Sequence, residues 1–222
     1  MKILKFILDW SEVWALLIPM VILMTRPRQP FYLRSVVIYV IVAFFLDLSI
    51  DVIGYFHRRL HFPAWLQSNN YLYNVHSILR FSCFTVFFDR TDARFKKLRQ
   101  WISWAALIIL LVNFSFFEGF VQERTFSSRL LTLEAGILMF YCLQYYLSRL
   151  REEPDLVKRN PEFWVVTGLS IYVVINFFIF LFYTTIVDTY KRFTQDIWDV
   201  HNIAYIVFCL FLAKAFYDAS RR

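Results

Sequence analysis

The sequence predicts an all-α, polytopic membrane protein built as one bundle of seven transmembrane helices. Hydrophobic residues make up 59% of the 222 residues, whereas charged residues make up only 18%. A soluble domain of this length cannot bury so much apolar surface, so lipid must cover part of it. Apolar stretches of about 20 residues, the length that crosses about 30 Å of hydrocarbon, recur to the end of the chain. Because no soluble module interrupts them, we expect residues 1–222 to form a single domain.

Turn chemistry and tryptophans set the boundaries of these stretches. RPRQP at 26–30, HFPAW at 61–65, EEPD at 152–155 and NPE at 160–162 are breaks between apolar runs. Tryptophans lie near several helix ends, as in an interfacial aromatic belt. The first stretch carries acidic residues and no cleavage site follows it, so we expect an uncleaved helix rather than a signal peptide. The seven helices are predicted, in chain order, at 6–25, 33–56, 69–88, 101–120, 128–148, 162–185 and 197–217.

The distribution of Lys and Arg predicts the orientation. With the N-terminus outside, the segments on the inner side carry roughly twice as many basic residues as those on the outer side, as the positive-inside rule requires. We therefore expect the N-terminus outside and the C-terminus in the cytoplasm. The net charge of +7 is explained by these loops, and no nucleic-acid motif accompanies it.

Polar residues interrupt the apolar helices at one common level. At a rise of about 1.5 Å per residue, they lie roughly 6–16 Å from the outer helix ends. Charged groups inside a bilayer usually mark a relay, a pathway or a ligand site. The inner helix halves are almost wholly apolar, which predicts a pocket that closes inward and argues against a channel. The candidate ligand-binding residues are Asp47, Asp51, Tyr73, Asn74, His76, Arg80, Asn113, Glu134, Tyr172, Asn176, His201, Asn202 and Tyr205.

Two acidic residues of the second helix need a cation. Asp47 and Asp51 are one turn apart and share a face. Arg80 lies at a similar depth on the adjacent third helix, which predicts an Asp47–Arg80 ion pair. Such a pair serves either to fix helix register or to position a ligand. Other acidic residues near helix ends, Glu12 among them, are expected at the solvated interface.

Three segments from Asn69 onward resemble short bacterial seven-helix membrane proteins, which are similar to the sensor halves of some membrane histidine kinases. NNYLYNVHSILRFSCFTVFF resembles their third helix, and HNIAYIVFCLFLAKAF resembles their seventh. NPEFWVVTGLSIYVVINFFIFLF is similar to their sixth, with Phe163-Trp164, Gly168 and Tyr172 in matching places. The resemblance implies a sensor-like bundle in the bacterial inner membrane and no established chemistry. Arg80 departs from the acidic residue expected before Phe81.

A metal-dependent intramembrane hydrolase is the alternative from another class. His76, His201, Asp51 and Glu134 are residue types that bind zinc. The ceramidase and adiponectin-receptor type of zinc hydrolase places histidines on the second and seventh helices, where this chain has His57 and His201. The H-x3-H pair of those enzymes and an HExxH motif are both missing, so no catalytic residue carries over and we predict no metal or cofactor.

The favoured interpretation is therefore a receptor-like or sensor-like protein with an outward-facing pocket for a small ligand. We expect no effector domain after the last helix, so signalling is expected to use a cytoplasmic partner at the basic loops 90–99 and 149–159. Besides the lipid bilayer and this partner, a second copy of the chain is an expected contact. A small-molecule transporter ranks third, because no internal repeat is present.

Overall fold

A computed structural model describes residues 2–56, 70–91, 94–112, 128–150, 160–189 and 193–221, and in these ranges all regular structure is helical. The α-helices are α1 (Lys2–Asp9), α2 (Ser11–Thr25), α3 (Arg34–Phe56), α4 (Asn70–Thr91), α5 (Lys96–Val112), α6 (Ser128–Arg149), α8 (Pro161–Thr189) and α9 (Phe193–Ala219). A 3-10 turn, η1 (Phe31–Leu33), leads into α3. The all-α prediction is confirmed, and the described residues of the predicted stretches are helical except at Trp10.

The first predicted helix is not continuous, because the helical conformation is interrupted at Trp10, between α1 and α2. Trp10 has φ −98° and ψ 11°, outside the α-helical region. A break leaves helix carbonyls without their usual N–H partners. Side chains replace them here: Trp14 Nε1 donates to Ile7 O at 2.8 Å, and Asn202 Nδ2 of α9 donates to Leu8 O at 2.9 Å. The break therefore ties the short α1 to both α2 and α9.

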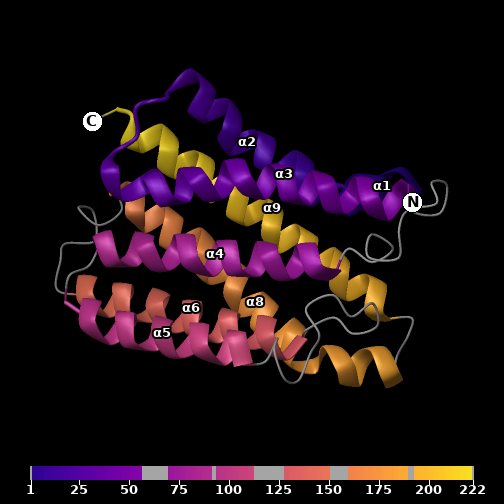
Figure 1. Cartoon of the computed structure of the whole chain (residues 1–222). Coiled ribbons are helices and arrows are strands. Elements are labelled where there is room, and N and C mark those ends of the chain that lie inside the picture. The colour runs from indigo at the N-terminus through magenta and orange to yellow at the C-terminus, as the bar shows by residue number, and fades with distance from the viewer. Residues whose placement is uncertain are drawn as a thin grey trace.

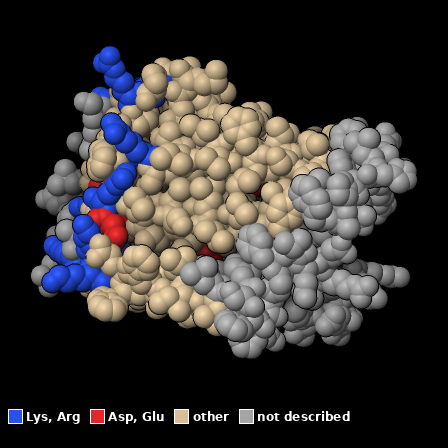
Figure 2. Space-filling model, in the orientation of Figure 1, with Lys and Arg blue, Asp and Glu red and all other residues tan. Residues whose placement is uncertain are grey.

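Four helices are long and apolar enough to cross a membrane, which indicates a membrane protein. They are Phe31–Tyr55, Leu130–Arg149, Pro161–Tyr183 and Asp196–Ala219, and the apolar α2 is shorter. Large apolar side chains remain exposed along their outer faces, such as Ile38 and Phe45 on α3 and Phe178 and Phe182 on α8. Figure 2 shows the result, a broad flank on which Asp and Glu appear only as small recessed spots. Lipid is the solvent that suits such a flank.

Six helices close into a ring. Along the ring, α2 packs on α3, α3 on α4, α4 on α6, α6 on α8, α8 on α9, and α9 returns to α2. The remaining long helix, α5, lies outside the ring against α4 and α6 (Figure 1). Of the α5 side chains from Trp101 to Ile109, only Ala106 is buried.

Among the residues that the structure describes, Lys and Arg gather mainly at one end of the ring, which we call the basic end. Here α2, α4, α6 and α9 finish, and α3, α5 and α8 begin (Figures 1 and 2). Contacts across this end confirm the grouping: Arg26 donates to Ser220 Oγ at 2.8 Å, Arg90 to Phe31 O at 3.2 Å, and Arg94 to Ser148 O at 3.2 Å. The basic residues described at this end are Arg26, Arg28, Arg34, Arg90, Arg94, Lys96, Lys97, Arg99, Arg149, Lys214 and Arg221.

The half of the ring nearer the basic end is filled by apolar and aromatic side chains. Phe84, Phe87, Phe208, Leu212 and Phe216 are fully buried. Phe84 and Phe208 meet with ring centroids 5.7 Å apart. This packing agrees with the predicted inward closure of the bundle.

One glycine allows a close helix contact in the ring, between α8 and α9. A Cβ placed on Gly168 would lie 2.5 Å from Phe211 Cβ, a distance that atoms fixed to two backbones cannot relieve by rotation. A Cβ on Gly136 of α6 would instead lie 3.4 Å from the movable ring of Phe177. The two glycines therefore form a matched pair for testing the fold.

We predict that Gly168→Ala lowers the stability of the protein in detergent by about 1–3 kcal/mol, because overpacking separates α8 from α9. Gly136→Ala should be neutral or stabilising, since alanine has the higher helix propensity by about 1 kcal/mol. Thermal unfolding followed by circular dichroism measures both. Equal effects of the two substitutions would show that α8 and α9 do not approach as closely as described.

Candidate functional site

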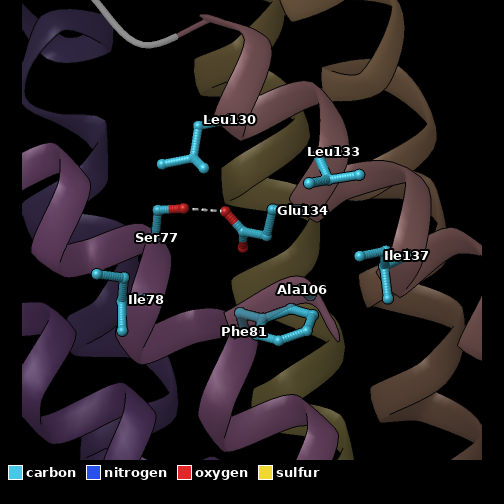
Figure 3. Close-up of a pocket in the computed structure, with 8 residues that line it drawn as sticks. All are labelled: Ser77, Ile78, Phe81, Ala106, Leu130, Leu133, Glu134 and Ile137. Carbon is cyan, nitrogen blue, oxygen red and sulfur yellow. Dashed lines mark hydrogen bonds between the residues drawn. The ribbon is translucent and has the colours of Figure 1, made fainter. Parts of the chain in front are cut away.

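The centre of the ring contains an ion pair between Arg80 of α4 and Glu134 of α6. Arg80 Nε donates to Glu134 Oε1 at 2.7 Å and Nη2 donates to Oε2 at 2.9 Å, a two-pronged contact. Arg80 Nη1 reaches across the ring to the hydroxyl of Tyr172 on α8 at 2.8 Å. Ser77, one turn before Arg80, also donates to Glu134 (Figure 3). Every Arg80 nitrogen thus has an acceptor, as a buried guanidinium requires.

The predicted Asp47–Arg80 pair is wrong, because Asp47 pairs with His76 instead. His76 Nδ1 lies 3.0 Å from Asp47 Oδ1, and Asp47 is fully buried. On α4, His76 faces α3, whereas Arg80 faces α6, so depth alone assigned the wrong partner. Tyr205 of α9 donates to Asp47 Oδ2 at 3.2 Å. Among the described residues Asp47 Oδ1 has no aligned hydrogen bond, so its contact with His76 is a close N–O approach, which is ionic only when the imidazole carries two protons.

A second histidine–carboxylate pair joins α9 to α2. His201 Nε2 lies 3.0 Å from Glu12 Oε1, and His201 Nδ1 contacts Asn176 Oδ1 of α8. Asn176 Nδ2 donates to Tyr172 O at 2.8 Å, which fixes the amide with its oxygen toward the imidazole. His201 Nδ1 must therefore carry a proton. The contact with Glu12 needs one more proton, carried either by the imidazole or by the carboxyl group.

These groups enclose a cavity of about 20 Å³. Its walls include Glu12, His76, Arg80, Tyr172 and His201, so both histidine pairs and the arginine border the same space. A cavity of this size holds a water molecule, which needs roughly 10–15 Å³ of space. A separate hollow of about 10 Å³ lies beside Glu134, between Phe81 of α4 and Ala106 of α5 (Figure 3). Binding of a ligand larger than water stays a prediction, and it requires the helices to separate.

Most of the candidate residues meet at this centre. Asp47, His76, Arg80, Glu134, Tyr172, Asn176, His201 and Tyr205 form the hydrogen-bonded and ionic contacts above, and Tyr73 lines the cavity. Asn202 is used to hold α1. Asp51 and Asn74 are partly buried and are not part of the cavity wall, and Asp51 Oδ2 has no partner in the described structure. Asn113 lies outside the described residues.

Three residues of the site were not among the candidates. Glu12 was expected at the solvated interface because it is near the start of an apolar run, yet its side chain is only 14% exposed. Tyr39 OH lies 3.4 Å from His76 Nε2, and Ser77 contacts Glu134. Glu12 carried a usable signal, an acidic residue inside a hydrophobic segment. Tyr39 and Ser77 carried none, because tyrosine and serine are ordinary in membrane helices.

The site does not offer a zinc-ligand set. His76 and His201 face different carboxylates, and Glu134 is occupied by Arg80. In the described part of the chain no three His, Cys, Asp or Glu side chains lie together as metal ligands would. The geometry therefore does not favour the hydrolase alternative.

We predict that Glu134→Gln destabilises the protein by about 3–5 kcal/mol, because it leaves the Arg80 charge buried without a counter-charge. The double variant Arg80→Met/Glu134→Gln should recover part of the loss. Thermal unfolding in detergent measures this double-mutant cycle. Strictly additive losses of stability in the cycle would show that Arg80 and Glu134 do not stabilise the protein as a pair.

Asp218→Asn provides the control for this cycle. Asp218 accepts from Lys214 Nζ at 2.8 Å, and the Lys214 side chain is 48% exposed. Loss of an exposed pair within one helix changes stability by only about 0.3–0.5 kcal/mol. A similar loss in Asp218→Asn and Glu134→Gln would mean that burial does not strengthen the central pair.

Comparisons of the chain with protein-family models, with curated proteins and with solved structures find no match. The resemblance to short bacterial seven-helix proteins and to histidine-kinase sensor halves therefore stays a prediction, and the function has to be argued from the site itself.

Proposed function

We propose that this chain is a sensor-like membrane protein whose buried site exchanges protons and passes the change to a partner at the basic end. The observation that carries the proposal is the pair of histidine–carboxylate contacts bordering one water-sized cavity inside an apolar ring. Histidine is the side chain whose charge changes most readily near neutral pH. Chains of Asp, Glu and His inside membranes are typical of proton-handling sites.

Charge balance explains why the site responds to protons. Arg80 compensates Glu134, so this pair is neutral without proton exchange. The Glu12–His201 pair is neutral only while it shares one extra proton, and the Asp47–His76 pair has the same requirement. Loss of either proton leaves an uncompensated charge in a dry interior, where charges interact strongly. The other titratable groups near the cavity are Tyr39, Asp51, Tyr73, Tyr172 and Tyr205.

The packing of the ring favours sensing over transport. The site lies in the half of the ring farther from the basic end, and fully buried Phe84, Phe87 and Phe208 fill the other half. A transported solute would need a path through this aromatic layer. A sensor needs only a helix that connects the site with the opposite surface.

Helix α2 supplies this connection. Glu12 near its start contacts His201, and Thr25 at its end lies about 20 Å farther along the helix axis. Immediately beyond, Arg26 bonds Ser220 at the end of α9. A changed Glu12–His201 contact would therefore alter the packing of both ends of α2 against α9. The partner is proposed to bind the basic surface near Arg26.

The proposal includes seven membrane crossings, with the N-terminus outside and the C-terminus in the cytoplasm of a bacterial inner membrane. The gathering of basic residues at one end supports this orientation, because positive charge collects on the cytoplasmic side. The seven crossings are α1 with α2, followed by α3, α4, α5, α6, α8 and α9. The site then faces the outer half of the bilayer.

Trp198 provides a direct test, since its ring lies 5.1 Å from the His201 ring. In protein reconstituted into vesicles, we expect Trp198 emission to be quenched by the protonated pair at low external pH and to recover as the pH rises. His201→Phe should abolish the response, Asp218→Asn should retain it, and Trp198→Phe identifies the emission of Trp198. Emission that is independent of pH in the unmodified protein would refute proton exchange at this pair.

A pH dye inside the same vesicles separates sensing from transport. The proposal predicts the Trp198 response with no more proton entry than in protein-free vesicles. Proton entry that depends on His201 would replace the sensor interpretation with transport.

A further inference from the structure

A groove of about 440 Å³ lies between α4 and α5, outside the ring. Its volume is within the range of about 300–1,000 Å³ that is typical of ligand sites. Ser82, Val86, Trp104 and Leu107 line it and are exposed, so the groove opens on the surface of the bundle. On a membrane protein this surface faces lipid.

Polar groups line this groove although it faces the apolar flank. Thr85 is only 9% exposed, and Thr85 Oγ1 has no hydrogen-bond partner in the described structure. Ser82, Gln100 and Ser103 add three more donors, and Ser103 also contacts Tyr141 OH at 2.9 Å. The one acidic residue of the lining, Asp89, is neutralised by Arg99 at 3.1 Å. The groove therefore offers hydrogen-bond donors without a net negative charge.

The polar lining continues toward the basic end. Lys96, Gln100, Trp104 and Leu107 follow one face of α5 at spacings of four, four and three residues. From Lys96 to Leu107 the helix rises about 16 Å. Lys96 and its neighbour Lys97 are both exposed at the start of α5, where helix N–H groups also favour anions. The order along this face of α5 is thus cationic at Lys96, just beyond the groove lining, then hydrogen-bonding and then apolar within the groove.

We propose that this groove binds one anionic phospholipid of the bilayer. Its phosphate would lie at Lys96, Lys97 and the start of α5, its ester oxygens would accept from Thr85 and Gln100, and an acyl chain would lie along Trp104 and Leu107. This sequence of chemistry matches the headgroup, glycerol and chain regions of a phospholipid. Basic pockets between membrane helices on the cytoplasmic side bind such headgroups.

Native mass spectrometry of the detergent-purified chain tests the site by titration with dioleoyl phosphatidylglycerol and dioleoyl phosphatidylcholine. We expect phosphatidylglycerol to bind more tightly. Lys96→Gln/Lys97→Gln should weaken its binding by up to about 30-fold at low salt and leave phosphatidylcholine unchanged. Arg28→Gln/Arg221→Gln removes the same charge at the same end, away from the groove, and should have little effect. Equal losses in the two double variants would overturn the proposal.

A second measurement tests occupancy of the groove itself. Phosphatidylglycerol with brominated acyl chains should quench Trp104, whose side chain is 64% exposed, and the difference from Trp104→Phe reports this residue alone. Val86→Trp, which fills the groove, should reduce the binding of both lipids. Quenching of Trp104 that is equally strong with brominated phosphatidylcholine would show contact with bulk lipid only and would refute a specific anionic site.

Discussion

The need to compensate buried charge in a dry ring is the constraint on which this structure depends. The Arg80 guanidinium is buried, so Glu134 and Tyr172 must face it, and Ser77 donates to Glu134. The same requirement brings His76 to Asp47 and His201 to Glu12. Each of the six ring helices contributes at least one side chain to these contacts. Because a membrane offers little hydrophobic force between helices, such polar contacts, together with the close approach at Gly168, determine how the helices rotate and pack.

The two ends of the ring have different chemistry, and α2 connects them. The half that contains the site carries the two histidine–carboxylate pairs and a water-sized cavity. The half near the basic end is an aromatic layer, in which Tyr39, Phe84 and Phe208 touch one another. Tyr39 belongs to both halves, since its hydroxyl reaches His76. In the proposed sensor, a local change of charge in the first half would reach the second through packed side chains and α2, which carries Pro19 within its length.

The position of α5 outside the ring leaves the groove between α4 and α5, which is the proposed lipid site. Phe81 of α4 lines this groove and also the small hollow beside Glu134. The Asp89–Arg99 contact joins α4 to α5. In addition, Arg99 Nη2 donates to Phe88 O at 3.0 Å, and the Arg99 backbone carbonyl accepts from Tyr141 of α6. These contacts anchor α5 to α4 and α6 near the basic end while the groove stays open farther along.

The sequence by itself determined the helix positions, the apolar exterior and the common level of the polar residues, because these depend on composition and on the rise per residue. It did not determine which charges pair. Asp47 and Arg80 share a depth, but His76 and Arg80 face different neighbours, and only the order of helices around the ring decides this. It also missed the break at Trp10, which places Glu12 beside His201 rather than at the interface. Partners, the size of the central cavity and the separate place of α5 are three-dimensional properties, set by how helices distant in sequence pack against one another.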